Sequence, residues 1–188
     1  MELSKPVMAI LYREEDVLKD FLSKLPISRL SESFYFEGLQ RYYSKEMGEG
    51  LLKVYASLDC MVKKEYIVPF KLWAMAQERF YALEGKRKLN IDAGYVDESH
   101  LVLASSKRRG ARIYMGSGVY VEIEYLYVYG SYRPLYWTYS DYRDRRVRAF
   151  FEQVREDFLK ELNLARKGNP FILCRFTEEE LYKEAKAW

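Results

Sequence analysis

Histidine and cysteine, the side chains that most often hold metals or act as nucleophiles, are scarce in this sequence. His100 is the only histidine, and Cys60 and Cys174 are the only two cysteines among 188 residues. The cysteines lie far apart and form no C-x-x-C pair, so we expect neither a disulfide framework nor a thiolate metal site and interpret both as small core residues. A zinc site would need all three residues from distant places, and no metal is predicted. His100 could act as a general base near neutral pH, or it is a partly buried polar residue beside an apolar run.

The glycine motifs of nucleotide-dependent enzymes are also missing. No G-x-x-x-x-G-K-[ST] occurs, and the pairs Gly48/Gly50 and Gly116/Gly118 lack the third glycine of a dinucleotide fingerprint. No G-x-S-x-G nucleophile elbow is present either. Classical ATP and NAD chemistry is therefore disfavoured, and the sequence implies no particular cofactor.

Long apolar runs and amide side chains are the remaining absences. No apolar run approaches the roughly 20 residues of a membrane span, and the N-terminal residues show no small-residue cleavage site. We therefore expect a cytoplasmic protein with no membrane partner. Three Gln and three Asn stand against many Glu, Lys, Arg and Tyr, a balance often seen in heat-adapted proteins.

The periodicity of apolar residues predicts a single α+β domain over residues 1–168. A buried strand is expected over residues 7–12, followed by an amphipathic helix over residues 13–25. Further strands are predicted at residues 33–36, 51–58, 88–95, 112–115 and 119–129. The last two form a hairpin, because Gly116 and Gly118 supply the positive φ angles of a tight turn. Pro69 favours a strand that leads into a short helix ending near residue 83, and residues 97–106 are expected to hold a helical turn.

A long helix and a short appendage complete the predicted fold. Ser140 or Asp141 can cap a helix that ends near residue 166 and presents a continuous apolar stripe. The resulting domain is a mixed, largely antiparallel sheet packed by the N-terminal helix and this long C-terminal helix. Residues 169–188 are expected to form a C-terminal appendage, with a capping box at Thr177 and Glu180 starting a short helix.

Tyrosine and positive charge are concentrated between Gly85 and Arg148. This segment holds ten of the 18 tyrosines and twelve Lys or Arg against seven Asp or Glu. Such a surface suits a planar anion, so our leading hypothesis is a protein that binds a nucleotide or an RNA-like anion. The candidate ligand-binding residues are Lys107, Arg108, Arg112, Trp137, Tyr139 and Tyr142. Alternatively, the tyrosines belong to the core and the basic runs are solvated loops.

Carboxylates beside glycines and tight turns suggest a rival class of function. Glu46, Asp92 and Asp141 could serve as acid, base or metal ligand in a small hydrolase or a phosphoryl-chemistry enzyme. Glu122 and Glu124 share one face of a strand and could do the same, or they form a solvated face. Whether the protein is an enzyme stays open. A third possibility is an interaction protein, for example a homodimer, that uses exposed tyrosines.

A set of short motifs together resembles a family of prokaryotic proteins of unknown function. The motifs are Tyr42–Gly48, Asn90–Tyr95, Leu101–Lys107, Arg112–Tyr114 with Gly118–Tyr120, and Trp137–Tyr142. The resemblance covers about residues 5–162, and family members are sometimes labelled GTP-binding, although no P-loop supports that label here. This chain departs from the family pattern where Ala93 replaces a proline, Ala111 a histidine and Ser140 a proline. If that histidine is catalytic in relatives, this chain lacks the activity.

Overall fold

The fold was analysed in a computed structural model that describes residues 1–176 and the backbone of residues 181–187. The strands are β1 (Leu3–Tyr12), β2 (Ile27–Leu30), β3 (Leu52–Leu58), β4 (Val62–Lys63), β5 (Leu89–Val96), β6 (His100–Ser105), β7 (Ile113–Gly116), β8 (Val119–Val128), β9 (Ser131–Pro134), β10 (Pro170–Phe176) and β11 (Leu181–Ala187). The helices are α1 (Glu15–Ser23), α2 (Glu37–Met47), α3 (Ile67–Tyr81) and α4 (Arg145–Arg166), with short 3-10 turns η1 (Lys64–Tyr66) and η2 (Ser140–Arg143).

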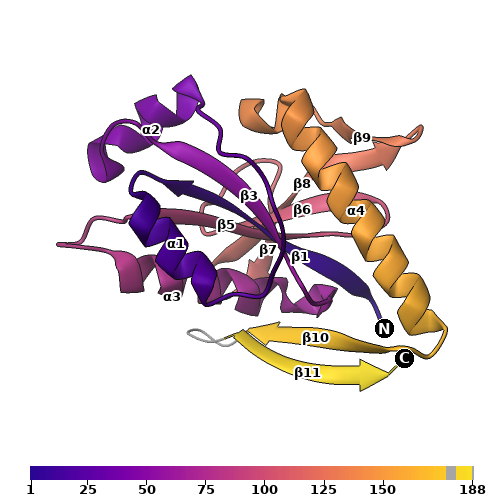
Figure 1. The fold of residues 1–188 in the computed structure, drawn as a ribbon. Coiled ribbons are helices and arrows are strands. Elements are labelled where there is room, and N and C mark those ends of the chain that lie inside the picture. The colour runs from indigo at the N-terminus through magenta and orange to yellow at the C-terminus, as the bar shows by residue number, and fades with distance from the viewer. Residues whose placement is uncertain (177–180, 188) are drawn as a thin grey trace.

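A single large antiparallel sheet forms the centre of the molecule (Figure 1). Its main strand order is β2-β3-β1-β5-β6-β8-β7, with β4 paired to β1 and β9 paired to β8. The predicted α+β class with a largely antiparallel sheet and a long C-terminal helix is confirmed. The hairpin predicted around Gly116 and Gly118 is also confirmed, as β7 and β8.

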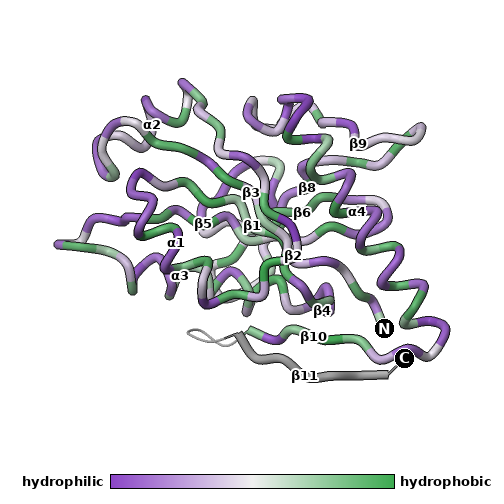
Figure 2. The backbone as a smooth tube through the Cα atoms, in the orientation of Figure 1, coloured by the Kyte–Doolittle hydropathy of each residue, from purple (hydrophilic) through white to green (hydrophobic). Residues whose placement is uncertain are grey.

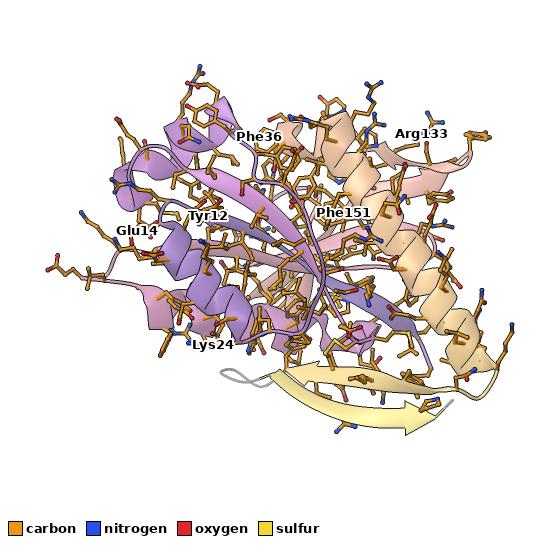
Figure 3. The ribbon with its side chains drawn as sticks, in the orientation of Figure 1. Tyr12, Glu14, Lys24, Phe36, Arg133 and Phe151 are labelled. Atoms are coloured by element: carbon orange, nitrogen blue, oxygen red, sulfur yellow. A yellow bond between two sulfur atoms is a disulfide. The ribbon has the colours of Figure 1, made fainter. Side chains whose placement is uncertain are left out.

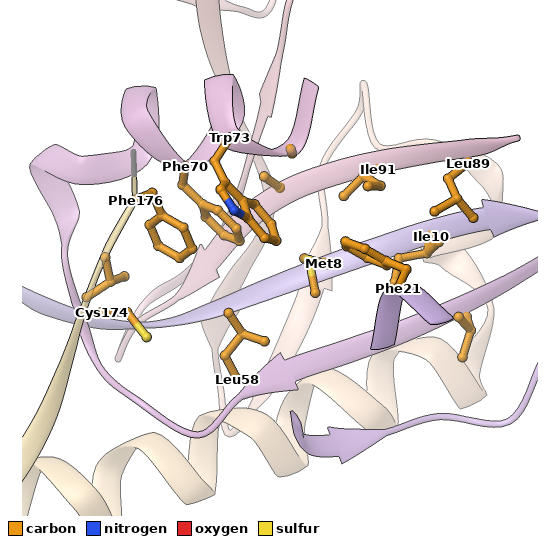
Figure 4. Close-up of a cluster of buried hydrophobic side chains, with 14 of the residues drawn as sticks. Met8, Ile10, Phe21, Leu58, Phe70, Trp73, Leu89, Ile91, Cys174 and Phe176 are labelled. Atoms are coloured by element: carbon orange, nitrogen blue, oxygen red, sulfur yellow. The ribbon is translucent and has the colours of Figure 1, made fainter. Parts of the chain in front are cut away.

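Both faces of the sheet are covered, because the residues of its central strand β1 alternate between two apolar clusters. Met8 and Ile10 pack with residues of α1, α3 and β10, whereas Val7 and Ala9 pack with residues of α4. Figure 2 shows that the hydrophobic residues gather in the middle strands of the sheet. Figure 4 shows the first cluster, with Trp73 of α3 lying over β1 and β5. Burial on both faces explains why residues 7–12 of β1 form a continuous apolar run.

Three segments differ from the predicted secondary structure. The region around Pro69 is helical. Pro69 is the third residue of α3, and the N–H groups of the first helical turn have no acceptor within the helix, so proline at this position removes no hydrogen bond. Residues 100–105 form β6 where a helical turn was expected. Residues 33–36, where the second strand of the chain was expected, contribute only an isolated bridge at Phe34. The second strand along the chain is β2 instead.

The long helix α4 begins a few residues later than predicted. Asp144 is its N-cap and accepts a hydrogen bond from the backbone N–H of Arg146 at 2.8 Å. Ser140 and Asp141 belong to η2, the turn that precedes the helix. The expected inner stripe is present, since Val147, Phe151, Val154, Phe158 and Leu162 are buried.

The two cysteines form a disulfide, which corrects the expectation that they are separate core thiols. Cys60 follows β3, Cys174 lies in β10, and their Cα atoms are 5.7 Å apart. Sequence separation concealed the pair, because the two positions are 114 apart in the sequence and only the fold brings them together. Next to the disulfide, Phe176 stacks on Phe70 with ring centroids 4.1 Å apart. The disulfide and this ring contact fix β10 to the main domain.

The C-terminal segment is a two-stranded hairpin made of β10 and β11. Residues 181–187, which were expected to belong to a short helix, are a strand paired with β10. The predicted capping box at Thr177 and Glu180 lies outside the described residues. In the part of the chain that the structure describes, no helix is long and apolar enough to cross a membrane.

Candidate functional site

A cavity of about 640 Å³ lies where the sheet divides between β5 and β6. These strands pair only from Gly94 to Val96 with Leu101 to Leu103, and β5 continues to Leu89 without β6 beside it. The strands meet at Gly94, where a Cβ atom would overlap the carbonyl oxygen of Val102. Glycine is therefore required at the closed end of the split.

Side chains of α3 replace the missing strand along β5. The backbone N–H of Ile91 donates to Glu78 Oε2 at 2.7 Å, and Lys71 Nζ donates to the carbonyl oxygen of Ile91 at 3.1 Å. Both backbone groups that a neighbouring strand would use are thus satisfied by charged side chains that also line the cavity. Burial raises the pKa of Glu78.

Lys53 of β3 is a buried cation of this site, as is Lys71. Its Nζ lies 2.6 Å from Asp141 Oδ2 and 3.9 Å from Asp92 Oδ2. Burial works to lower the pKa of Lys53, but the charges of Asp141 and Asp92 outweigh it and the pKa is raised. Lys53 therefore keeps its proton and serves as a fixed positive charge and hydrogen-bond donor. It is not a nucleophile in this state, because only a neutral amine is nucleophilic. The Tyr55 hydroxyl donates to the same Asp141 oxygen at 3.2 Å.

Arg112 connects three segments of the wall. Its guanidinium donates to Glu122 Oε2 at 3.0 Å, to the Ser105 hydroxyl at 2.9 Å and to the carbonyl oxygen of Lys107 at 2.8 Å. It also donates to the Tyr139 hydroxyl at 2.9 Å. Since all three of its nitrogens are engaged, Arg112 holds the loop after β6 against β8 and the segment before η2.

Among the carboxyl groups that line the cavity, Glu124 has the largest pKa shift. The β6–β8 register skips Glu124, since Leu101 pairs with Tyr125 and Val102 with Ile123, so Glu124 occupies a β-bulge. One of its oxygens accepts from the backbone N–H of Tyr139 at 3.0 Å. Burial, with smaller contributions from nearby carboxylates, raises the pKa of Glu124 to about 7.

Lys107 lines the cavity from the loop after β6. Its Nζ donates to the Tyr42 hydroxyl at 2.8 Å and lies 5.0 Å from the centre of that ring. The ion pairs among the described residues include none to Lys107, so its charge is not neutralised by a carboxylate. The hydrogen bond from Lys107 lowers the pKa of Tyr42. Phe36, labelled in Figure 3 near α2, lines the same cavity.

Six of the nine predicted site residues line this one cavity. They are Lys107, Arg112, Tyr139, Tyr142, Asp92 and Asp141. Tyr142 is 1% exposed, and its ring lies 4.8 Å from Lys53 Nζ. They come from three separate segments of the chain, namely β5, the loop between β6 and β7, and the segment at η2, and only the fold brings these segments together.

The other three predicted residues lie elsewhere. Arg108 lines a neighbouring hollow with Arg109 and Tyr114, and Arg112 lines both this hollow and the cavity. The indole N–H of Trp137 donates to the carbonyl oxygen of Ile123 at 2.8 Å, which uses its polar atom in the fold. Glu46 pairs with Arg87, whose Nε lies 2.9 Å from Glu46 Oε2, and this contact lowers the pKa of Glu46. His100 is also remote from the cavity, with its Nδ1 3.1 Å from Asp97.

Sequence reasoning missed three charged residues of the wall. Lys53, Lys71 and Glu78 all line the cavity. Lys53 left one visible signal, since it is a charged residue in the otherwise apolar stretch 51–56. Such a residue is buried only with a partner, which here is Asp141. Lys71 and Glu78 left none, because their role depends on the separation of β5 and β6.

No group of three or more His, Cys, Asp or Glu side chains with the geometry of a metal site occurs among residues 1–176. Asp92 and Asp141 pair with Lys53, Glu122 pairs with Arg112, and Glu78 pairs with Arg87. The arrangement supplies fixed cations, buried hydrogen-bond acceptors and tyrosine rings around one cavity.

Comparison with known proteins gives one match. A family model described as Domain of unknown function (DUF4416) matches residues 2–158. The matched residues include every residue that lines the cavity, whereas β10 and β11 lie outside them. The searches of curated proteins and of solved structures found no match.

Proposed function

Since this chain belongs to the family described as Domain of unknown function (DUF4416), as the resemblance predicted, we propose a function from the cavity itself: binding of a nucleotide-sized anionic small molecule. One observation carries the proposal. Lys107, a cation without a carboxylate partner, lines the same cavity as the tyrosines Tyr42, Tyr139 and Tyr142. An anionic group pairs with the ammonium group of Lys107, and the rings supply apolar contact for a planar group.

The size of the cavity favours a small molecule over a polymer. A volume of about 640 Å³ falls within the range of pockets that enclose small ligands, roughly 300–1,000 Å³. An RNA strand would need an open groove that follows its backbone. The nucleotide of our leading hypothesis therefore fits better than the RNA-like anion.

Calorimetric titration with nucleoside monophosphates tests this proposal. We expect binding at low salt that weakens between about 50 and 300 mM KCl, because ions screen the attraction to Lys107. Lys107→Ala should weaken binding about tenfold, the size of one charge-assisted hydrogen bond. Lys160→Ala is the matched control, since Lys160 is exposed on α4 and does not line the cavity. Absence of binding by every nucleotide at low salt would reject the proposal.

A second candidate is acid–base catalysis on the bound molecule. The supporting observation is Glu124, a buried carboxyl group whose pKa of about 7 matches that of a general acid or base at neutral pH. Asp92 and Asp141 share the cavity with it, which fits a small hydrolase or a phosphoryl-chemistry enzyme. Glu46 is not proposed as an acid or base, because its carboxylate pairs with Arg87. Incubation with phosphate esters, followed by phosphorus NMR, should show turnover that Glu124→Gln abolishes; turnover that survives Glu124→Gln would exclude this role.

Cytoplasmic location and heat adaptation are further proposals. Disulfides are rare in the cytosol of mesophiles, but intracellular proteins of hyperthermophiles are rich in them. The disulfide between Cys60 and Cys174, together with the few Gln and Asn residues, favours the cytoplasm of a heat-adapted cell. Alkylation of thiols in fractionated native cells should find the oxidised protein in the cytosolic fraction, and its recovery from the periplasmic fraction would contradict the proposal.

Exposed tyrosines support a partner surface such as a homodimer. Tyr129 and Tyr136, which flank β9, are 93% and 98% exposed. Light scattering should show a dimer that Tyr129→Ser and Tyr136→Ser together convert to a monomer. A monomeric wild-type protein would remove this proposal.

A further inference from the structure

Two buried carboxylate oxygens on the cavity wall have no hydrogen-bond partner among the described residues. They are Glu122 Oε1 and Glu124 Oε2. Both residues line the cavity, and they are only 4% and 1% exposed. Burying an acceptor without a donor is costly, and native proteins seldom leave such a group unexplained.

The second oxygen of each carboxyl group is held in place. Glu122 Oε2 accepts from Arg112 Nε at 3.0 Å, and Glu124 Oε1 accepts from the backbone N–H of Tyr139 at 3.0 Å. Because one oxygen of each group is fixed, the unpartnered oxygens are preorganised acceptors rather than mobile ones. The β-bulge at Glu124 adds to this, since bulges often redirect a side chain next to a functional site.

The charge on this part of the wall points in the same direction. Four carboxyl groups, those of Asp92, Glu122, Glu124 and Asp141, lie on this part of the wall, and only two cations, Lys53 and Arg112, form ion pairs with any of them. Glu124 itself has no cation within the ion pairs of the described residues, although Lys53 acts on it at longer range. Acceptors with excess negative charge select a ligand group that offers N–H donors.

We infer that Glu122 and Glu124 recognise an N–H donor group of the ligand, such as an exocyclic amine or an amidine. The inference deepens the proposed function, on which it rests for the use of this cavity. The ligand then carries an anionic group for Lys107 and a nitrogen-bearing edge for the two carboxylates. Among nucleotides, amino-substituted bases are selected over bases that present a carbonyl oxygen at the same position.

Matched nucleotide pairs test the inference by calorimetry at about pH 8, where Glu124 is ionised. The pairs are CMP with UMP and AMP with IMP, which differ by an amino group against a carbonyl oxygen. We expect the amino member of at least one pair to bind tenfold or more tightly. Glu124→Gln should reduce or reverse that preference, because the amide N–H₂ placed at Oε2 donates to a carbonyl oxygen and repels an amine. Glu122→Gln should weaken the preference as well.

Glu49→Gln is the control, because Glu49 is exposed and lies outside the cavity wall. Circular dichroism melting confirms that each variant is folded. Equal binding of amino and carbonyl members, or a preference that both cavity variants retain, would overturn the inference while leaving the proposed function intact.

Benzamidine, which has two N–H donor groups and no anion, separates the two proposals. If no nucleotide binds, the proposed function fails, and benzamidine then decides the inference alone. Benzamidine binding that Glu124→Gln abolishes supports the inference. A benzamidine affinity that is absent, or that neither Glu122→Gln nor Glu124→Gln changes, overturns it.

Discussion

Lys53 and Asp141 form a buried ion pair between β3 and the turn before α4, with 2.6 Å between Nζ and Oδ2. Both side chains are 5% exposed, and 88 residues separate them in the sequence. The pair therefore joins two distant segments at the floor of the cavity. The same lysine reaches toward Asp92 of β5, so one cation organises carboxylates from two segments.

Removing the charge of Lys53 should destabilise the protein strongly. Lys53→Met leaves Asp141 buried without its cation, which costs about 3–5 kcal/mol in the free energy of unfolding. The double variant Lys53→Met with Asp141→Asn should recover part of that loss, because no unpaired charge remains. Urea denaturation of Lys53→Met, Asp141→Asn, their double variant and the Lys160→Ala control gives the coupling. Additive losses in the double variant would show that the pair is not coupled.

Stability should depend on pH through Glu124. Its folded pKa of about 7 exceeds the ordinary value of 4.5, so between these pH values the folded state holds a proton that the unfolded state has released. The free energy of unfolding then falls as pH rises, by at most about 1.4 kcal/mol per pH unit. The stabilising contribution is fully present below pH 4.5 and is lost by the time the pH exceeds about 7.

Comparison with Glu124→Gln isolates this contribution from other titrating groups. The variant lacks the proton equilibrium, so its stability relative to wild type should increase from pH 5 to pH 7 and level off above. Denaturant unfolding at several pH values measures the difference. A constant difference over this range would mean that Glu124 titrates normally in the folded protein.

Local patterns in the sequence were sufficient for the fold class and for α4. The apolar stripe of α4 recurs at helical spacing, and Gly116 with Gly118 marks the hairpin directly. The strand predicted around Pro69 was wrong, because proline opposes a helix only beyond the first turn. The start of α3 also has no side-chain cap that would mark it in the sequence. The family resemblance was also recognisable, since it depends on residues along most of the chain.

The cavity could be predicted only in part. Charge and tyrosine content identified Lys107, Arg112 and Tyr139, which do line one volume. The separation of β5 from β6 was not predictable, because it depends on how strands pair across the sheet rather than on any single strand. Arg108 was included only because it is basic and adjacent to Lys107, yet neighbouring loop residues point in different directions and it lines another hollow.

Reduction of the disulfide should weaken the fold. Cys60 and Cys174 close a loop of 114 residues, and in the chain-entropy model such a crosslink contributes about 4–5 kcal/mol by restricting the unfolded state. Urea denaturation with and without a phosphine reductant measures the loss. The double variant Cys60→Ser with Cys174→Ser is the control, because its stability should not respond to the reductant. A wild-type protein that is equally insensitive would contradict the prediction.

Gly94→Ala should disturb the cavity as well as the fold, because Gly94 lies where β5 and β6 meet. The added methyl group would overlap the backbone of Val102, and the strands must move apart to relieve it, at a cost of about 3 kcal/mol. Gly110→Ala is the matched control, since Gly110 has no positive φ, has nothing within 4 Å of an added Cβ and does not line the cavity, so alanine there should add about 0.4–1 kcal/mol. Hydrogen exchange should show faster opening of β5 and β6 in Gly94→Ala alone. Unchanged exchange in these strands would mean that the split does not depend on their close approach at Gly94.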